Sequence, residues 1–160
     1  MDYELQVIIV PVRDVERSLR FYAEGCGFRL DVDYEPNDAF RVVQLTPPGS
    51  ACSLQLGIGL SDAAPGTSRN AVIAVRNIEA ARQELIDRGV SVESIRHKSS
   101  VDDWQGDVTE GPDPERRDYA SFATFSDPDG NTWTLQEIGF KAPTPMRSST
   151  PLAAGRDHTA

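Results

Sequence analysis

The chain has 160 residues, 39% hydrophobic and 26% charged, which is the size and composition of one globular domain rather than of a disordered or membrane-spanning chain. Its formal net charge is −9, and acidic residues flank its one dense basic cluster, Arg116-Arg117, which argues against a nucleic-acid partner. With strand-sized apolar runs, no leader-like start and two isolated cysteines, we expect a cytoplasmic protein that has no membrane partner.

The first half of the chain predicts a strand, a helix and three more strands. A β-branched run at 7–10 precedes Asp14, whose side chain can cap the helix that begins at Val15. Val15, Leu19 and Tyr22 share one face of this helix, and a glycine at 25 or 27 ends it. Turn-forming residues then separate three predicted strands, at 28–34, 40–45 and 52–60.

The second half repeats this pattern after a linker at 61–69 that is rich in Ala, Gly, Pro and Ser. A predicted strand at 71–75 precedes Asn77, which occupies the same capping position as Asp14. The helix that follows ends at Gly89, and three further strands are predicted at 91–96, 119–126 and 132–138. Each half therefore predicts a βαβββ module, the first at about 5–60 and the second at about 70–139.

Two segments depart from the repeat. The stretch 97–118 is long, polar and carries Trp104, which predicts a functional or mobile loop. The segment 141–160 is rich in Pro, Ser, Thr and Ala without periodicity, which predicts a disordered tail. We therefore expect one domain at 1–140, followed by this tail.

Two motifs resemble those of the vicinal oxygen chelate superfamily, which contains glyoxalases, bleomycin-resistance proteins and extradiol dioxygenases. One is the segment 12–22 followed by Gly27-Phe28, and the other is the Asp-Pro-Asp-Gly turn at 127–130. With the repeat, the resemblance covers about 5–139. It implies an α+β fold of two tandem βαβββ modules that form an incomplete barrel around a cavity, and it also implies a homodimer.

The metal-dependent members of this superfamily carry four ligands, one on the first strand and one on the last strand of each module. By resemblance these positions fall on Val7, Gln55, Asn70 and Thr134. Valine has no donor atom, Asn and Thr are weak neutral donors, and only Gln55 is a plausible ligand. Val7, Asn70 and Thr134 therefore argue against a divalent metal, and we expect no cofactor.

The same positions describe an apolar hollow with a few polar groups, as in pockets for small molecules. Aromatic side chains stack on ligands in the antibiotic-binding members of the superfamily, which adds four candidates here. The predicted ligand-binding residues are Val7, Ile9, Phe40, Gln55, Asn70, Trp104, Tyr119, Phe122 and Thr134.

Two functions are consistent with the sequence, and whether the protein is an enzyme stays open. The first is a metal-free protein that binds a small organic molecule, as in the bleomycin-resistance branch. The alternative is a glyoxalase-like lyase, isomerase or dioxygenase that uses a displaced metal, or acid–base chemistry through Gln55, Glu137 or His97. A protein-interaction module has no specific support in the sequence.

Overall fold

The structure, a computed structural model, describes residues 1–142 and contains two mixed sheets. The elements of the first module are β1 (Val7–Ile9), α1 (Val15–Arg20), the π-helical η1 (Phe21–Gly25), β2 (Arg29–Asn37), β3 (Phe40–Thr46) and β4 (Ser53–Ile58). Its sheet has the order β1-β4-β3-β2, in which β1 runs parallel to β4 and the other pairs are antiparallel.

The second module repeats this topology with one additional strand. Its elements are β5 (Ala71–Val75), α2 (Ile78–Asp87), β6 (Arg96–Lys98), β7 (Val108–Glu110), β8 (Ser121–Ser126) and β9 (Thr132–Glu137). The sheet order is β5-β9-β8-β6-β7, again with a parallel first pair. The predicted α+β fold with two tandem βαβββ modules is therefore confirmed.

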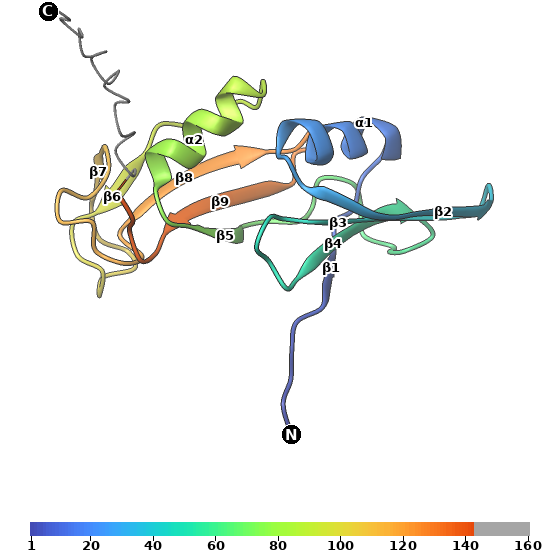
Figure 1. Cartoon of the computed structure of the whole chain (residues 1–160), viewed down its shortest axis with the longest axis horizontal. Helices are drawn as coiled ribbons and strands as arrows, with labels where there is room; N and C mark the ends of the chain where they lie inside the picture. Colours follow the sequence, from blue (N-terminus) through green and yellow to red (C-terminus); the bar gives the residue numbers. More distant parts are fainter. Residues whose placement is uncertain (143–160) are drawn as a thin grey trace, which may run out of the picture.

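The two modules lie side by side along the long axis of the molecule, with α1 and α2 on the same side of the sheets (Figure 1). The opposite side of both sheets carries no helix, and the sheets do not close into a barrel. We call the helix-free side of each sheet its open face.

Both helices begin at the residues that the sequence predicts. The carboxylate of Asp14 accepts a hydrogen bond from the backbone N–H of Arg17 at 3.0 Å, and the amide oxygen of Asn77 accepts one from Ala80 at 3.0 Å. Each cap satisfies an N–H group that the first helical turn leaves unpaired. Alternate residues of the strands, such as Leu54 and Leu56, are buried under these helices.

The Asp-Pro-Asp-Gly turn joins the two modules. The hydroxyl of Tyr22, in the first module, donates to the carboxylate of Asp127 at 2.8 Å and accepts from the indole N–H of Trp133 at 3.0 Å. Burial, together with the charge of Asp127, raises the pKa of Tyr22, which keeps the phenol protonated as the donor. Asn131 donates to the carbonyl oxygen of Pro11 at 2.9 Å. The motif is therefore a buried contact between modules.

The second half differs from the prediction in two places. The stretch 97–118, predicted as a loop, contains most of β6 and all of β7, which pair at the edge of the sheet. Such a short, polar edge strand has no alternating apolar pattern to reveal it. Of the predicted strand at 91–96, residues 91–95 are irregular apart from one bridge between Val92 and Phe125, and Arg96 belongs to β6, where it pairs with Phe122 of β8.

Residues 143–160 lie outside the described part of the chain, so the prediction for the tail concerns residues that the structure does not describe. In the described part, no helix has the length and apolar character needed to cross a membrane.

Candidate functional site

The strand registers establish which residues of the two modules are equivalent. Ile8 and Ala71 each lie six residues before their helix cap, and they pair with Leu54 and Trp133, respectively. The next residues, Gln55 and Thr134, are therefore equivalent, as the sequence predicts. The register supports this equivalence even though the 47–50 loop shifts the sequence spacing.

The predicted residues on the strands lie on the two open faces. Val7, Ile9 and Gln55 alternate with buried residues of the first sheet, and Ile9 is 45% exposed. Phe40 shares the alternation of Gln44 on β3 and belongs to the same face. Thr134 and Phe122 lie on the open face of the second sheet, where the guanidinium of Arg96 sits 5.3 Å from the Phe122 ring centroid.

The other three predicted residues lie outside the strands. Trp104, between β6 and β7, is 83% exposed, and the Lys98 ammonium lies 4.2 Å from its ring centroid. Tyr119 precedes β8 and is exposed, whereas Asn70 precedes β5 and donates its backbone N–H to the hydroxyl of Thr132. Tyr119 and Asn70 both have a positive φ, which is uncommon outside glycine. The nine predicted residues therefore occupy two sheet faces and three loop positions.

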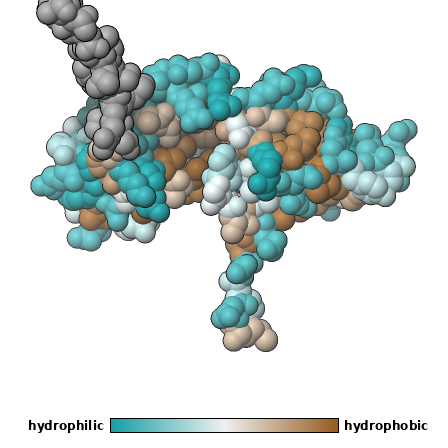
Figure 2. Space-filling model, in the orientation of Figure 1, coloured by the Kyte–Doolittle hydropathy of each residue, from teal (hydrophilic) through white to brown (hydrophobic). Residues whose placement is uncertain are grey.

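A hollow of about 510 Å³ lies where the two modules meet, and we call it the junction hollow. Its lining residues are Leu5, Ile8, Pro47, Pro48, Gly49, Ser50, Cys52, Ser53, Leu54, Ala71, Val72, Ile73, Ala74 and Trp133. A smaller hollow of about 170 Å³ shares Pro47, Pro48, Ile73 and Ala74 with it, and Cys26 also lines this second hollow. Figure 2 shows hydrophobic side chains on both sides of the centre of the molecule, between the helices and the N-terminal arm.

None of the nine predicted residues lines the junction hollow, although sequence neighbours of five of them do. Ile8 lies beside Val7 and Ile9, and Leu54, Ala71 and Trp133 lie beside Gln55, Asn70 and Thr134, respectively. The alternation pattern correctly separates the faces of each strand, but the hollow forms where the 47–50 loop lies against β5 of the other module. The one sequence signal at this position is the Pro47-Pro48 pair, which by itself predicts only a turn.

A row of hydrogen-bonded polar side chains crosses the open face of the first module, and we call it the polar row. Gln55 donates its amide N–H to Gln44 at 2.9 Å, and Gln44 donates to the Ser53 hydroxyl at 3.5 Å. The hydroxyls of Ser53 and Thr46 lie 2.6 Å apart, and Thr46 also contacts the carboxylate of Asp31. Ser53 belongs both to this row and to the lining of the junction hollow.

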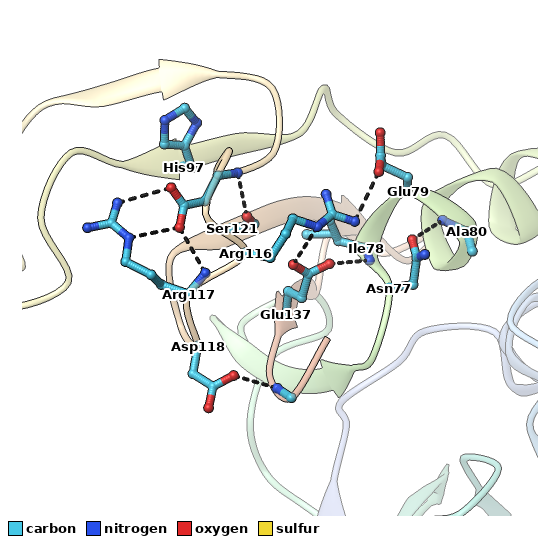
Figure 3. Close-up of polar contacts among 12 residues, drawn as sticks. Asn77, Ile78, Glu79, Ala80, His97, Arg116, Arg117, Asp118, Ser121 and Glu137 are labelled. Carbon is cyan, nitrogen blue, oxygen red and sulfur yellow. Dashed lines mark hydrogen bonds and ion pairs between the residues drawn. The ribbon is translucent and has the colours of Figure 1, made fainter. Parts of the chain in front are cut away.

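Glu137, which the sequence suggests as a candidate for acid–base chemistry, lies on the helix side of β9 (Figure 3). Its side chain is buried, and one carboxylate oxygen accepts from the backbone N–H of Ile78 at 2.9 Å. The other oxygen lies 3.3 Å from the guanidinium of Arg116, which also pairs with Glu79 at 3.0 Å. This carboxylate therefore anchors the positive N-terminus of α2 and holds the segment that precedes β8.

His97 and Asp113 complete the polar contacts around this segment. The Nδ1 atom of His97 lies 2.9 Å from the carbonyl oxygen of Gly111. Asp113 is buried and accepts two hydrogen bonds from the Arg117 guanidinium, at 2.9 and 3.0 Å. These bonds hold the pKa of Asp113 at about 2, below its ordinary value.

The residues at the superfamily's metal-ligand positions do not fit a divalent ion. Val7 offers only hydrocarbon, Gln55 is hydrogen-bonded within the polar row, and Thr134 lies on the other sheet. Across residues 1–142, no group of three or more His, Cys, Asp or Glu side chains is placed to hold a metal ion. We therefore derive no chemistry through a metal.

The family model of the Glyoxalase/Bleomycin resistance protein/Dioxygenase superfamily matches residues 4–135. No curated protein sequence matches the chain.

Three solved structures resemble the fold closely. TnmS3, an antibiotic binding protein from Streptomyces sp. CB03234, is 30% identical with a TM-score of 0.64, over 85% of this chain and 96% of its own. A glyoxalase/bleomycin resistance protein from the same organism is also 30% identical, with a TM-score of 0.62, over 83% of this chain and 99% of its own. A superfamily member from Sphaerobacter thermophilus DSM 20745, at 23% identity and a TM-score of 0.63 over 86% of this chain and 98% of its own, supports the fold alone.

Proposed function

The chain belongs to the glyoxalase/bleomycin resistance protein/dioxygenase superfamily, and within it we propose a metal-free protein that binds a small organic molecule. The observation that carries this proposal is the junction hollow of about 510 Å³, which lies in the size range of small-molecule pockets. Most of its lining is apolar, with Ser50, Cys52 and Ser53 as the polar exceptions. Such a lining favours an apolar ligand that a few polar groups orient.

The similarity to TnmS3 supports the same role. That protein is described as antibiotic binding, and the alignment spans nearly its whole length at 30% identity. From this similarity we infer only that this chain also binds a small organic molecule. We infer the kind of molecule from the side chains around the hollow.

We further propose that the protein is a homodimer. The N-terminal arm that precedes β1 extends away from the body of the molecule (Figure 1), and its Tyr3 and Leu5 are 88% and 69% exposed. Large apolar side chains exposed together favour burial against a partner. Leu5 also lines the junction hollow, so an arm ordered by a second copy would reshape the ligand site.

Protection of Cys52 from alkylation tests the binding site. Cys52 lines the junction hollow, and Cys26 is the internal control because burial raises the pKa of its thiol to about 12. We expect 1-naphthol, used as an apolar aromatic probe, to slow the reaction of Cys52 with iodoacetamide at pH 8 in the intact protein, while Cys26 stays largely unmodified with or without the probe. An unchanged rate at probe concentrations that bind by calorimetry would exclude this hollow as the site.

Elemental analysis tests the metal-free part of the proposal. After dialysis against Zn²⁺, Ni²⁺ or Mn²⁺, we expect less than about a tenth of an ion per chain. About one tightly held ion per chain would overturn the assignment.

Analytical ultracentrifugation tests the homodimer. We expect the mass of two chains, and a mass of one chain at micromolar concentrations would contradict the proposal.

A further inference from the structure

Resting on this proposed function, we propose that the ligand carries a hydrogen-bond donor, a phenolic hydroxyl or an N–H group, which it gives to the side-chain oxygen of Gln55. The hydrogen bonds of the polar row set this preference, because every side chain of the row donates toward Asp31, beginning with Gln55 at the far end.

Asp31 fixes the first bond. Hydrogen bonds from Thr46 and from Arg29, which lies 2.7 Å away, lower the pKa of Asp31 below its ordinary value. At neutral pH Asp31 is therefore a carboxylate, which accepts hydrogen bonds and donates none. The single hydroxyl hydrogen of Thr46 must then point at Asp31.

The orientation of Thr46 then determines which group donates in each of the remaining bonds. Because the hydrogen of Thr46 is committed, the Ser53 hydroxyl at 2.6 Å donates to Thr46. Ser53 then accepts from the amide N–H of Gln44, and this orientation turns the Gln44 oxygen toward Gln55. Gln55 accordingly donates its own N–H to Gln44 at 2.9 Å.

The row therefore ends on an acceptor. An isolated pair of glutamine amides can exchange the positions of O and N together, since the two orientations differ little in shape. Here the carboxylate of Asp31 removes that freedom. No side chain or backbone group within residues 1–142 donates to the Gln55 oxygen, which has two lone pairs available.

A ligand in the junction hollow reaches this oxygen by extending past Ser53 onto the open face, because Gln55 does not itself line the hollow. Ser53 lines the hollow, and Gln55 projects from the same face of β4 two residues further on, about 7 Å away along the strand. Val7 and Ile9 of β1 lie outside the hollow, but they pair in register with Ser53 and Gln55 and add apolar surface to the same open face. A molecule of two or three fused rings with one hydroxyl or N–H group spans this distance, so we assign that class of ligand.

Calorimetric titration with a matched pair of probes tests the preference. 1-Naphthol can donate a hydrogen bond, whereas 1-methoxynaphthalene of nearly the same shape cannot. We expect the intact protein to bind 1-naphthol about tenfold more tightly, as one hydrogen bond to a half-buried acceptor that the ligand covers predicts. In the Gln55→Leu variant the two probes should bind alike, with little change for 1-methoxynaphthalene.

Two further variants test whether the preference depends on the polar row. One changes a residue of the row, and the other changes a residue of the second module. Asp31→Asn allows the first bond to reverse and should reduce the preference at least about twofold, because asparagine both donates and accepts. Thr124→Val, at the second-module position equivalent to Gln44, should leave the preference unchanged. Thermal unfolding of each variant verifies that it is folded.

The outcomes distinguish this inference from the proposed function. Equal binding of both probes by the intact protein would overturn the inference and leave small-molecule binding standing. The side-chain amides also report on the row without any ligand: Gln44 and Gln55 should each show one Nε2 hydrogen protected from solvent exchange, and Asp31→Asn should weaken the protection. Rapid exchange of all four hydrogens in the intact protein would overturn the directed row whatever binds.

Discussion

The two modules share one backbone plan but carry different polar groups at equivalent positions. On the open faces, Gln44 lies opposite Gln55 in the first module, whereas Thr124 lies opposite Thr134 in the second. The amides are hydrogen-bonded to each other and reach out from the sheet, while the threonines are short. The first module therefore presents the more specific polar surface.

On the helix side of the sheets, the second module is the one that carries the polar group. Glu137 is buried beneath the start of α2, and its counterpart in the first module is Ile58, an exposed apolar residue near the end of β4. The buried charged groups of the second module fix its long connections, and the first module has no equivalent connection to hold. The two modules thus share a backbone fold but use their polar side chains differently. Those of the first module form an exposed polar surface, and those of the second form buried contacts that hold the chain together.

The largest expected effect concerns the contact that joins the modules. Asp127→Ala leaves Tyr22 and Asn131 without their buried acceptor, and we expect a loss of about 3 kcal/mol in the free energy of unfolding. Urea denaturation measures this loss. Asp129→Ala is the control, because Asp129 accepts a single exposed hydrogen bond from Arg13 and should cost less than about 1 kcal/mol. Equal effects would show that the turn does not join the modules through Asp127.

A substitution at equivalent positions compares the helix sides directly. Glu137→Leu removes the acceptor for Ile78 and takes from the largely buried Arg116 one of its two carboxylate partners, so we expect a loss of about 2 kcal/mol. Ile58→Leu should change stability by less than about 0.5 kcal/mol, because Ile58 is 40% exposed. If both variants keep their stability in chemical denaturation, the buried pair does not anchor the second module.

Acid should weaken the second module through Asp113. Its pKa is about 2 in the folded protein, below the unfolded value near 3.9, so its contribution is fully present above about pH 4 and is lost as the pH falls toward 2. We expect Asp113→Asn to remove about 1–2 kcal/mol at pH 7 and much less at pH 2.5. The difference between parent and variant in urea titrations at the two pH values measures this. A pH-independent difference would contradict the shifted pKa.

The smallest effects are expected on the open faces. Gln55→Leu breaks one half-buried hydrogen bond and should cost about 0.5–1 kcal/mol, whereas Thr134→Val should be nearly neutral. Thermal unfolding with matched scan rates compares the two. A Thr134→Val variant that loses more stability than Gln55→Leu would remove the distinction between the two faces.

The repeat, both helix caps and the alternation of the strands are local properties, and the sequence alone was enough to predict them. Asp14 and Asn77 cap helices because a side chain next to a helix start meets the unpaired N–H groups directly. Strand alternation is local in the same way: Val7, Gln55 and Thr134 lie away from the helix side because successive strand residues point to opposite faces. The family motifs added the topology.

Only the tertiary structure decided how these elements meet. Asp127 was predicted as part of a turn, yet its carboxylate contacts Tyr22, a residue 105 positions away. The junction hollow combines the loop at 47–50 with β5, and the polar row depends on the register between three strands. Periodicity describes where a side chain points along its own strand, whereas a pocket or a directed row of hydrogen bonds depends on the packing of segments that are distant in the chain.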